Sequence, residues 1–406
     1  MYKVVVGLTL ALSWSASAAA QTITLGRALE LAATQHPMLR AGEAGVDAAS
    51  AGVVTARAYP NPEFGVIAGR QRGNDPRAGV PLYEVRQPLE LGSLRGTRVE
   101  FAERGREASE HRLDEVRLGV LSQVRRSFYQ VLRREAEARQ ATENLQLVED
   151  LRRRIQVRVD VGEVGRLELV RAEAEVAAAR TLASSAQLQQ VTAVAQFRAA
   201  VGGGLDTAVH VVGSLDPPAA LPALEALRQE ARQRHPALQR AGAEVRQAEA
   251  RMDYERALRL PQPTIWTEFD YSSPTYRAGV VVPVPVWNRR QGPIAEADAV
   301  LRQVGAEARA REIEILAALD GAYERYMVAT QQVALFEQGL LREAEEALRA
   351  AEVAYQLGER GILDVLDAQR VLRAVRLNFL NAHYERQAAL IDLDELRGHD
   401  LLGVTP

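Results

Sequence analysis

Apolar residues recur at three- and four-residue spacing over long stretches of the chain that contain no proline. Between residues 92 and 158, the positions Leu113, Val116, Val120 and Val124 follow this spacing, which is typical of one face of an amphipathic α-helix. A helix of about 66 residues would be about 100 Å long at 1.5 Å per residue. Because such a helix cannot be buried within a compact core, it must pack in coiled coils or line a large assembly.

The pattern of apolar and polar positions along the whole chain predicts a mainly α protein with a small β part. Two units share one order of elements, which is helix, strand, strand, long helix and helix, with boundaries at proline and glycine. The first unit, 21–215, has helices over 24–57, 92–158 and 165–200 and strands over 62–70 and 80–90. The second unit, 216–406, has helices over 223–257, 290–355 and 361–398 and strands over 263–271 and 276–287.

Short motifs recur between the two units in the same order. We interpret the chain as a tandem duplication of a unit of about 190 residues, which is too long a period for the usual short-repeat solenoids. The matching pairs are His36-Pro37 with His235-Pro236, Pro60-Asn61-Pro62 with Pro261-Gln262-Pro263, Gln87-Pro88-Leu89 with Val284-Pro285-Val286, and residues 162–173 with 358–369.

The predicted strands alternate between apolar and polar residues. In the fourth strand, Tyr276, Ala278 and Val280 fall on one face, and Arg277 and Gly279 fall on the other. This alternation is typical of transmembrane β-barrel strands, although an amphipathic sheet on a soluble core would look the same. Four strands cannot close a barrel, so a membrane-spanning chain must oligomerise. Aromatic residues in or beside the strands predict an interfacial girdle, namely Tyr59, Tyr83, Trp266, Tyr271, Tyr276 and Trp287.

Composition and charge exclude several classes of function. The chain has 406 residues, a formal net charge of −3 and no cysteine. Nucleic-acid binding is disfavoured by the near-neutral charge, and disulfides and thiolate metal sites are excluded. The six histidines have no ligand spacing, and no phosphate-binding loop or nucleophile–base pair is present. We therefore predict no enzyme, no cofactor and no resident metal.

The first twenty residues have the pattern of a secretory signal. Lys3 precedes the apolar run 4–12, and Ala18-Ala19-Ala20 offers a small-residue cleavage site. The run is too short to span a bilayer as a helix. We predict export from the cytoplasm with cleavage after Ala20.

With these features, the chain resembles the TolC family of trimeric outer-membrane efflux ducts. The segment Leu363-Asp364-Val365-Leu366-Asp367-Ala368 after a glycine turn carries the family resemblance, and Tyr59-Pro60-Asn61-Pro62-Glu63 and Gln87-Pro88-Leu89-Glu90-Leu91-Gly92 resemble its CzcC-like heavy-metal branch. The resemblance implies a homotrimer in the outer membrane of a Gram-negative bacterium. It would form a 12-stranded barrel, in contact with lipid, over a periplasmic tunnel of antiparallel coiled-coil hairpins. The implied partners are a periplasmic adaptor and an inner-membrane resistance-nodulation-division pump.

The resemblance also implies a gate at the closed end of the tunnel. Tyr355 and Arg360 match the gate-holding side chains of the family, and Glu168 matches their acidic partner. Asp364 and Asp367 share one helix face and would form rings of carboxylates that favour cations. Alternatively, they are solvated acids favoured at a helix N-terminus. The turns at the tip, which would contact the adaptor, contain Gly162, Gly165, Gly358 and Gly361.

Two classes of function remain for the chain. The first is a gated exit duct that conducts heavy-metal cations, with drug efflux or type I secretion as the alternative cargo. The second is a soluble periplasmic coiled-coil scaffold or adaptor, in which the strands form a small capping sheet. Recovery in the soluble periplasm without detergent would contradict the first class.

Overall fold

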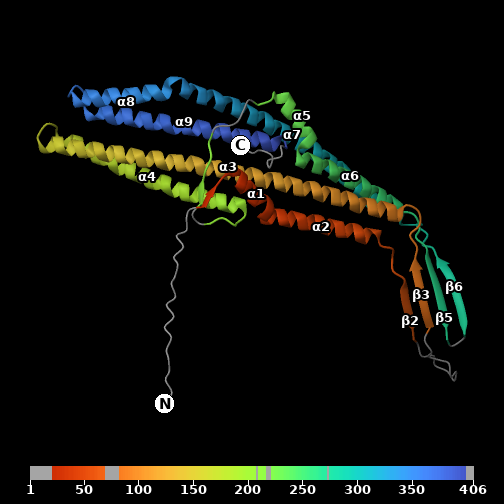
Figure 1. Cartoon of the computed structure of the whole chain (residues 1–406). Helices are drawn as coiled ribbons and strands as arrows, with labels where there is room; N and C mark the ends of the chain where they lie inside the picture. Colours follow the sequence, from red (N-terminus) through yellow and green to blue (C-terminus); the bar gives the residue numbers. More distant parts are fainter. Residues whose placement is uncertain (1–20, 69–81, 207–208, 216–220, 272–273, 399–406) are drawn as a thin grey trace, which may run out of the picture.

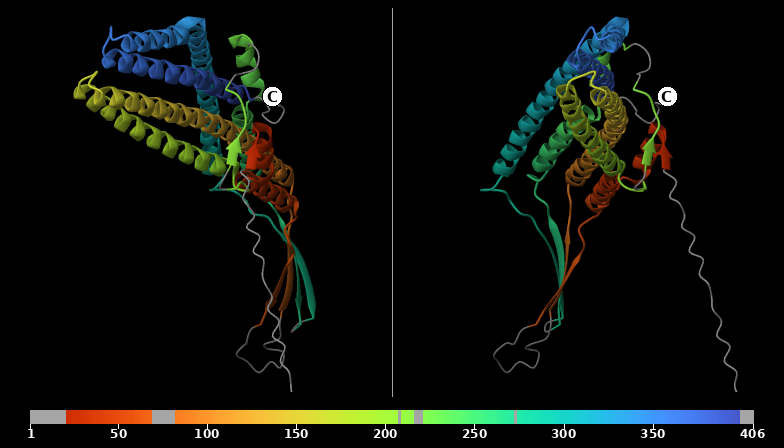
Figure 2. Two further views of the ribbon diagram at one scale, coloured as in Figure 1. Left: turned by 60° about the vertical axis from the view of Figure 1, so that its left-hand side comes forward. Right: turned by 90° about the vertical axis from the view of Figure 1, so that its left-hand side faces the viewer.

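The protein is an elongated bundle of helical hairpins with a small sheet at one end (Figure 1). The computed structural model describes residues 21–68, 82–206, 209–215, 221–271 and 274–398. Two further views show the sheet leaving the same end of the helical bundle (Figure 2). The predicted signal segment 1–20 lies outside the described residues.

Each unit begins with a pair of helices rather than the single helix that the periodicity predicts. The expected helix 24–57 is α1 (Leu25–Gln35) and α2 (Pro37–Arg57), and the expected helix 223–257 is α5 (Leu224–Arg234) and α6 (Pro236–Ala257). Proline causes both breaks, because the residue before it is pushed out of the α conformation.

The residue at each break is a histidine that caps the next helix. Nδ1 of His36 accepts a hydrogen bond from the Met38 amide at 3.2 Å, and Nδ1 of His235 accepts one from the Ala237 amide at 3.1 Å. Side-chain acceptors at this position satisfy amide groups that have no partner within the helix. The two histidines therefore have the same structural role in the two units.

The helices that follow the strands form two long hairpins. The first hairpin is α3 (Leu94–Asp160), an uninterrupted helix of 67 residues, and α4 (Arg166–Val201). The second is α7 (Gln291–Leu335), a π-helical turn η1 (Phe336–Leu340), α8 (Leu341–Gln356) and α9 (Ile362–Leu396). The prediction of one continuous helix over 290–355 was therefore wrong at η1, where Gly339 has a φ of 158° and leaves the helical conformation.

The sheet joins the two units side by side. Its four antiparallel strands, in the spatial order β2-β3-β5-β6, are β2 (Glu63–Ile67), β3 (Leu82–Pro88), β5 (Thr264–Asp270) and β6 (Thr275–Val281). The fourth strand ends at Val281 and not at 287, because its partner strand β5 begins at Thr264, opposite Val281.

Two further strands were missed by sequence analysis. The three-residue strand β1 (Gln21–Ile23) pairs in parallel with β4 (Val209–Val211) beside the helices. Strands this short carry too few residues for an alternation to be recognised. Their apolar side chains join the largest buried cluster of the protein, which also contains Phe128 and Phe197.

Candidate functional site

Two glycine turns lie at the end of the molecule opposite the sheet (Figure 1). Gly162 follows α3 and Gly358 follows α8, with φ angles of 78° and 75°. Glycine adopts this left-handed conformation without the steric cost that a side chain would bring. The two turns thus close the two hairpins at one tip of the bundle.

A buried tyrosine links the two hairpins at this tip. The Tyr355 hydroxyl of α8 donates a hydrogen bond to Oε2 of Glu168 on α4, at 2.9 Å. The ring belongs to an apolar cluster with Ile155, Ile362 and Val365, and the residue is only 8% exposed. The sequence prediction placed Tyr355 and Glu168 in one gate, and the structure brings these two side chains together.

The surroundings of Tyr355 keep its hydroxyl protonated. Burial, together with the hydrogen bond to the Glu168 carboxylate, raises the pKa of Tyr355 to about 12. The Arg158 guanidinium lies over the ring, 4.8 Å from its centroid. The neutral Tyr355 hydroxyl thus donates to the Glu168 carboxylate in a partly buried contact between α3, α4 and α8.

The other predicted gate residues lie at the surface of the tip. The side chains of Arg360 and Asp364 are exposed, and within the described part of the chain Arg360 bonds only through its backbone amide, to the Ala354 carbonyl at 3.3 Å. Asp367 is also exposed and pairs with Arg370 at 3.4 Å. A single chain therefore does not bring Arg360 to Glu168.

A second link between the hairpins was missed by sequence analysis. Glu175 on α4 is 7% exposed, and its carboxylate lies 2.7 Å from Arg370 and 3.6 Å from Arg373, both on α9. The repeat analysis gave no signal for it, because the matching position in the second unit is Val371. The arginine spacing of three residues along α9 is a weak sequence signal, since it places both on one helix face.

The sheet has one apolar and one charged face. Phe64, Tyr83, Tyr276 and Val280 share the first face and are all exposed to solvent in the single chain. On the opposite face, Arg277 pairs with Glu268 at 3.0 Å, and Arg86 pairs with Glu84. The alternation predicted from the sequence is thus present in the sheet.

The assignment of Trp266 to the aromatic girdle was wrong. The strand register places Trp266 opposite Arg86 and Gly279, on the charged face. A Cβ atom on Gly279 would lie 2.8 Å from the indole ring, so the ring covers this glycine. Because side chains alternate along a strand, Trp266 cannot share a face with Tyr83 and Tyr276. Three other residues predicted for the girdle, Tyr59, Tyr271 and Trp287, flank the strands and are exposed.

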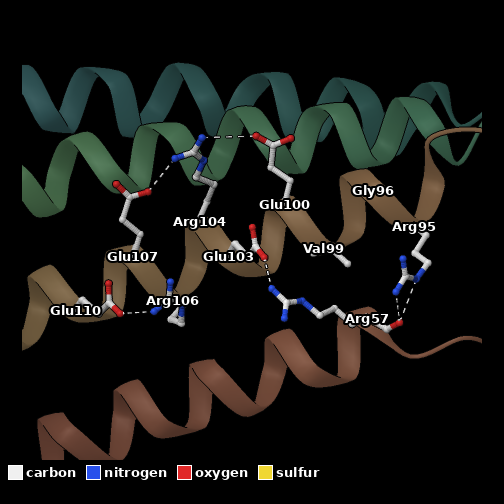
Figure 3. A pocket seen from close by; sticks show the side chains of 10 residues that line it. All are labelled: Arg57, Arg95, Gly96, Val99, Glu100, Glu103, Arg104, Arg106, Glu107 and Glu110. Atoms are coloured by element: carbon white, nitrogen blue, oxygen red, sulfur yellow. Dashed lines mark hydrogen bonds and ion pairs between the residues drawn. The ribbon is translucent and has the colours of Figure 1, made fainter.

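A groove of about 580 Å³ lies between α2 and α3, near the sheet (Figure 3). Four arginines and four glutamates line it. They pair with one another, for example Arg57 with Glu103 and Arg106 with Glu110, each at 2.6 Å. Because the charges balance, the groove has no excess field that would attract an ion of either sign.

The described ranges contain no candidate metal centre. No group of three or more His, Asp or Glu side chains among those residues has the geometry to hold a metal ion. Likewise, no helix of the described chain is both long and apolar enough to cross a membrane.

Long helical hairpins with a small two-faced sheet at one end define the fold of TolC-like channel proteins. A membrane protein from Pseudomonas aeruginosa matches with a TM-score of 0.81 at 20% identity, over 92% of this chain and 90% of that one. The solved structure of CusC matches with a TM-score of 0.78 at 20% identity, over 93% and 92%. These likenesses confirm the predicted fold class.

The family model for outer membrane efflux proteins matches residues 28–203 and 227–399. The chain therefore belongs to the outer membrane efflux protein family, whose members are transport ducts and not enzymes. It is 28% identical over 384 residues to the cobalt-zinc-cadmium resistance protein CzcC of Cupriavidus metallidurans, covering 94% of this chain and 91% of that protein. It is 26% identical over 301 residues to the nickel-cobalt-cadmium resistance protein NccC of Alcaligenes xylosoxydans xylosoxydans, covering 72% and 66%.

Proposed function

We propose that this protein is the outer-membrane exit duct of a tripartite efflux system for heavy-metal cations. The observation that carries the proposal is the similarity to a protein named for cobalt, zinc and cadmium resistance over 94% of the chain. The partners would be a periplasmic adaptor and an inner-membrane pump of the resistance-nodulation-division type. The exported chain would enter the outer membrane after removal of residues 1–20.

The sheet supports a membrane-spanning role for an oligomer. Its apolar face is exposed at Phe64, Val66 and Tyr276, as lipid contact requires. Strands β2 and β6 are the outer strands of the sheet, and within the described residues of one chain each has one edge without a neighbouring strand. An open edge is unstable in hydrocarbon, so copies of the chain would close the barrel together. A trimer would supply 12 strands.

The tip supports a gate that opens when the two hairpins separate. Separation would break the contact of Tyr355 with Glu168 and that of Arg370 with Glu175. Arg360 is exposed and is thus available to a neighbouring copy of the chain. Asp364 and Asp367 would form carboxylate rings at the narrowest point, which favour cations over anions. Arg370 partly offsets the charge of Asp367, and Arg171 would offset it further if it faced the bore.

Deletion of the gene tests the substrate class. We expect growth to become sensitive to cobalt, zinc or cadmium, and the full-length chain to restore tolerance. A panel of drugs is the matched comparison, because an exit duct for drugs would change drug tolerance and leave metal tolerance unaltered. The second result would overturn the metal assignment and favour a drug or secretion duct.

Membrane fractionation tests the alternative class of a soluble scaffold. We expect the protein in the outer-membrane fraction, released by detergent and conducting ions in a planar bilayer. Recovery in the soluble periplasm would favour the scaffold. The exposed apolar side chains of one sheet face speak against it, since burying them elsewhere would need a partner for the whole face.

A further inference from the structure

Within one chain, hydrogen bonds of backbone amides join the end of β3, in the first unit, to the segment that precedes β5, in the second unit. Beyond the end of β3, the Leu89 amide donates to the Pro263 carbonyl at 2.8 Å. Two residues further, the Leu91 amide donates to Oε1 of Gln262 at 2.8 Å. The edge of the first unit is thereby sealed by the Pro261-Gln262-Pro263 segment that precedes β5.

The corresponding segments at the two outer edges of the sheet have no partner segment within the described chain. Val284-Pro285-Val286 lies beyond the end of β6, and its counterpart Gln87-Pro88-Leu89 contains the last two residues of β3 and the residue after it. Pro60-Asn61-Pro62 precedes β2 as Pro261-Gln262-Pro263 precedes β5. The segment after β6 thus corresponds to one side of the internal junction, and the segment before β2 corresponds to the other side.

We propose that residues 282–288 of one chain pair with residues 61–66 of a second copy in the register of the internal junction. This inference rests on the proposed barrel, and it adds the residues that seal it. The Val286 amide takes the place of Leu89 and donates to the carbonyl of Pro62. The Asn288 amide takes the place of Leu91 and donates to the side-chain oxygen of Asn61, which is one methylene shorter than Gln262.

In this antiparallel register, Val284 pairs with Phe64 of the second copy, and Val282 pairs with its Val66. This register agrees with the side-chain directions. Phe64 and Val66 belong to the apolar face of the sheet, and Val282 and Val284 have the sequence parity of Val280 on that face. In the order of the two pairs, the four residues are 73%, 69%, 49% and 53% exposed in the single chain. A register shifted by one residue would instead set apolar side chains against the charged face.

The direction of the backbone amides provides an independent check. In an antiparallel sheet, successive residues direct their N–H groups to alternate sides. Since Leu89 bonds to Pro263, the same alternation directs the amide of Val281 toward its β5 neighbour Thr264. Continued beyond the end of β6, it would direct the amides of Val282 and Val284 toward the outer edge.

The two prolines of the segment fall where an amide is not needed. Pro283 and Pro285 share the inward direction of Val281, but β5 begins at Thr264, opposite Val281. Their missing N–H groups therefore cost no ladder bond, and the outward amides of the three valines are retained. The alternating Val-Pro-Val-Pro-Val sequence fits an edge that pairs on its outer side only.

One bond of the single chain must be exchanged when the copies pair. The Val286 amide donates to the Val284 carbonyl at 2.9 Å in the single chain, and both groups are needed by the second copy. The exchange forms bonds at Val282 and Val284 in addition, so the number of backbone hydrogen bonds rises. Pro62 has no amide hydrogen, as Pro263 has none, and only its carbonyl is used.

Disulfide trapping tests the register, because the chain has no cysteine of its own. Val281 and Ile67 of neighbouring copies would form a pair without backbone hydrogen bonds, with Cα atoms about 4.5 Å apart, which is within disulfide range. Within one chain the two residues lie on the opposite outer strands, three strand spacings or about 14 Å apart. A disulfide in the variant I67C/V281C can therefore form only between copies.

The matched control is G65C/V281C, which traps a register shifted by two residues on the same face. A Cβ atom on Gly65 would meet only ordinary contacts, the nearest at 3.7 Å. In full-length protein oxidised in outer membranes, we expect at least tenfold more covalent oligomer from I67C/V281C on a non-reducing gel. More oligomer from the control would overturn the register.

Native size in detergent, measured beforehand on the unmodified chain, separates this inference from the proposed function. An oligomer that forms neither disulfide would overturn the edge pairing while the duct remains. A monomer would overturn the proposed barrel itself. As a second measurement, Asn61→Ala should lower the temperature at which the oligomer dissociates, and Asn61→Gln should preserve it. Equal dissociation temperatures for Asn61→Ala and the unmodified chain would contradict the role of Asn61.

Discussion

The two long hairpins of this protein share one order of helices and turns, but they differ in continuity. Helix α3 runs for 67 residues and accommodates Gly105 and Gly119 without interruption. Its counterpart is divided into α7 and α8 by the π-helical turn around Gly339. A π-helical turn inserts one residue into the helical ladder, and such insertions mark sites of bending or function.

The hairpins also differ in the chemistry of the tip. At the tip, the carboxylates of Glu168 and Glu175 lie on the first hairpin, and their partners Tyr355 and Arg370 lie on the second. Further from the tip the order is reversed, because a buried pair joins Arg125 of α3 to Asp394 of α9 at 2.8 Å. Each hairpin has a buried cluster away from the tip, around Phe128 and Phe197 in the first and around Leu319 and Leu393 in the second, so the difference lies in η1 and in the tip contacts. We expect the first hairpin to be the more rigid one and the second hairpin to bend at η1. Four experiments test this difference.

The largest effect is expected at the base of the first hairpin. Phe197 is fully buried, and its ring lies 5.8 Å from that of Phe128. Phe197→Ala should lower the free energy of unfolding by about 3–5 kcal/mol, because it removes a large side chain from a packed core. The control is Phe379→Ala, which removes a partly exposed ring beside η1 and should cost less than half as much. Hydrogen exchange measures the loss of stability in each variant. Equal losses in the two variants would show that the two hairpins are equally well packed.

Breaking the contact of Arg370 with Glu175 should have the next largest effect. Arg370→Ala leaves a buried carboxylate with only Arg373 at 3.6 Å, and should lower the opening free energy of tip amides by about 1–3 kcal/mol, less than a fully buried pair. Glu175→Gln in the same chain should recover part of the loss, since no buried charge remains. If the change in opening free energy of the double variant equals the sum of the changes in the two single variants, Arg370 and Glu175 are not coupled.

Alanine at two glycines should change stability in opposite directions. Gly339→Ala should destabilise the second hairpin by about 1–2 kcal/mol, because a φ of 158° disfavours a side chain. Gly119→Ala should stabilise α3 by about 0.5–1 kcal/mol, because a Cβ atom there has no contact within 4 Å and alanine favours the helix. Thermal unfolding followed by circular dichroism measures both. The same sign for both variants would contradict the difference between the hairpins.

The smallest effect is expected for the hydroxyl of Tyr355. Tyr355→Phe keeps the ring in its cluster and removes the bond to Glu168, which should cost about 0.5–1.5 kcal/mol in opening the tip. The pKa of about 12 in the folded chain lies above the usual value of 10. The stabilisation by Tyr355 is therefore present below pH 10 and lost as the pH rises toward 12. The phenylalanine variant should lack this pH dependence, and an identical profile would exclude Tyr355 as its source.

Much of the architecture followed from local sequence patterns. The helical spacing from Leu113 to Val124, the alternation in β6 and the glycine turns at Gly162 and Gly358 each depend on neighbouring residues alone. Family membership and the TolC-like fold were predicted from such segments and are confirmed by the comparisons. The misplacement of Trp266 was avoidable, because Thr264 and Glu268 share its parity along the strand.

The sequence by itself determined the order of helices and strands, the two faces of the sheet and the turns, because periodicity, proline and glycine act over a few residues. Only the tertiary structure decided which side chains meet. The bond between Tyr355 and Glu168 joins residues 187 positions apart, and the pairing of Glu175 with Arg370 spans 195. Such contacts depend on how two hairpins pack, and the periodicity of a single helix contains no information about the rotation of its neighbour.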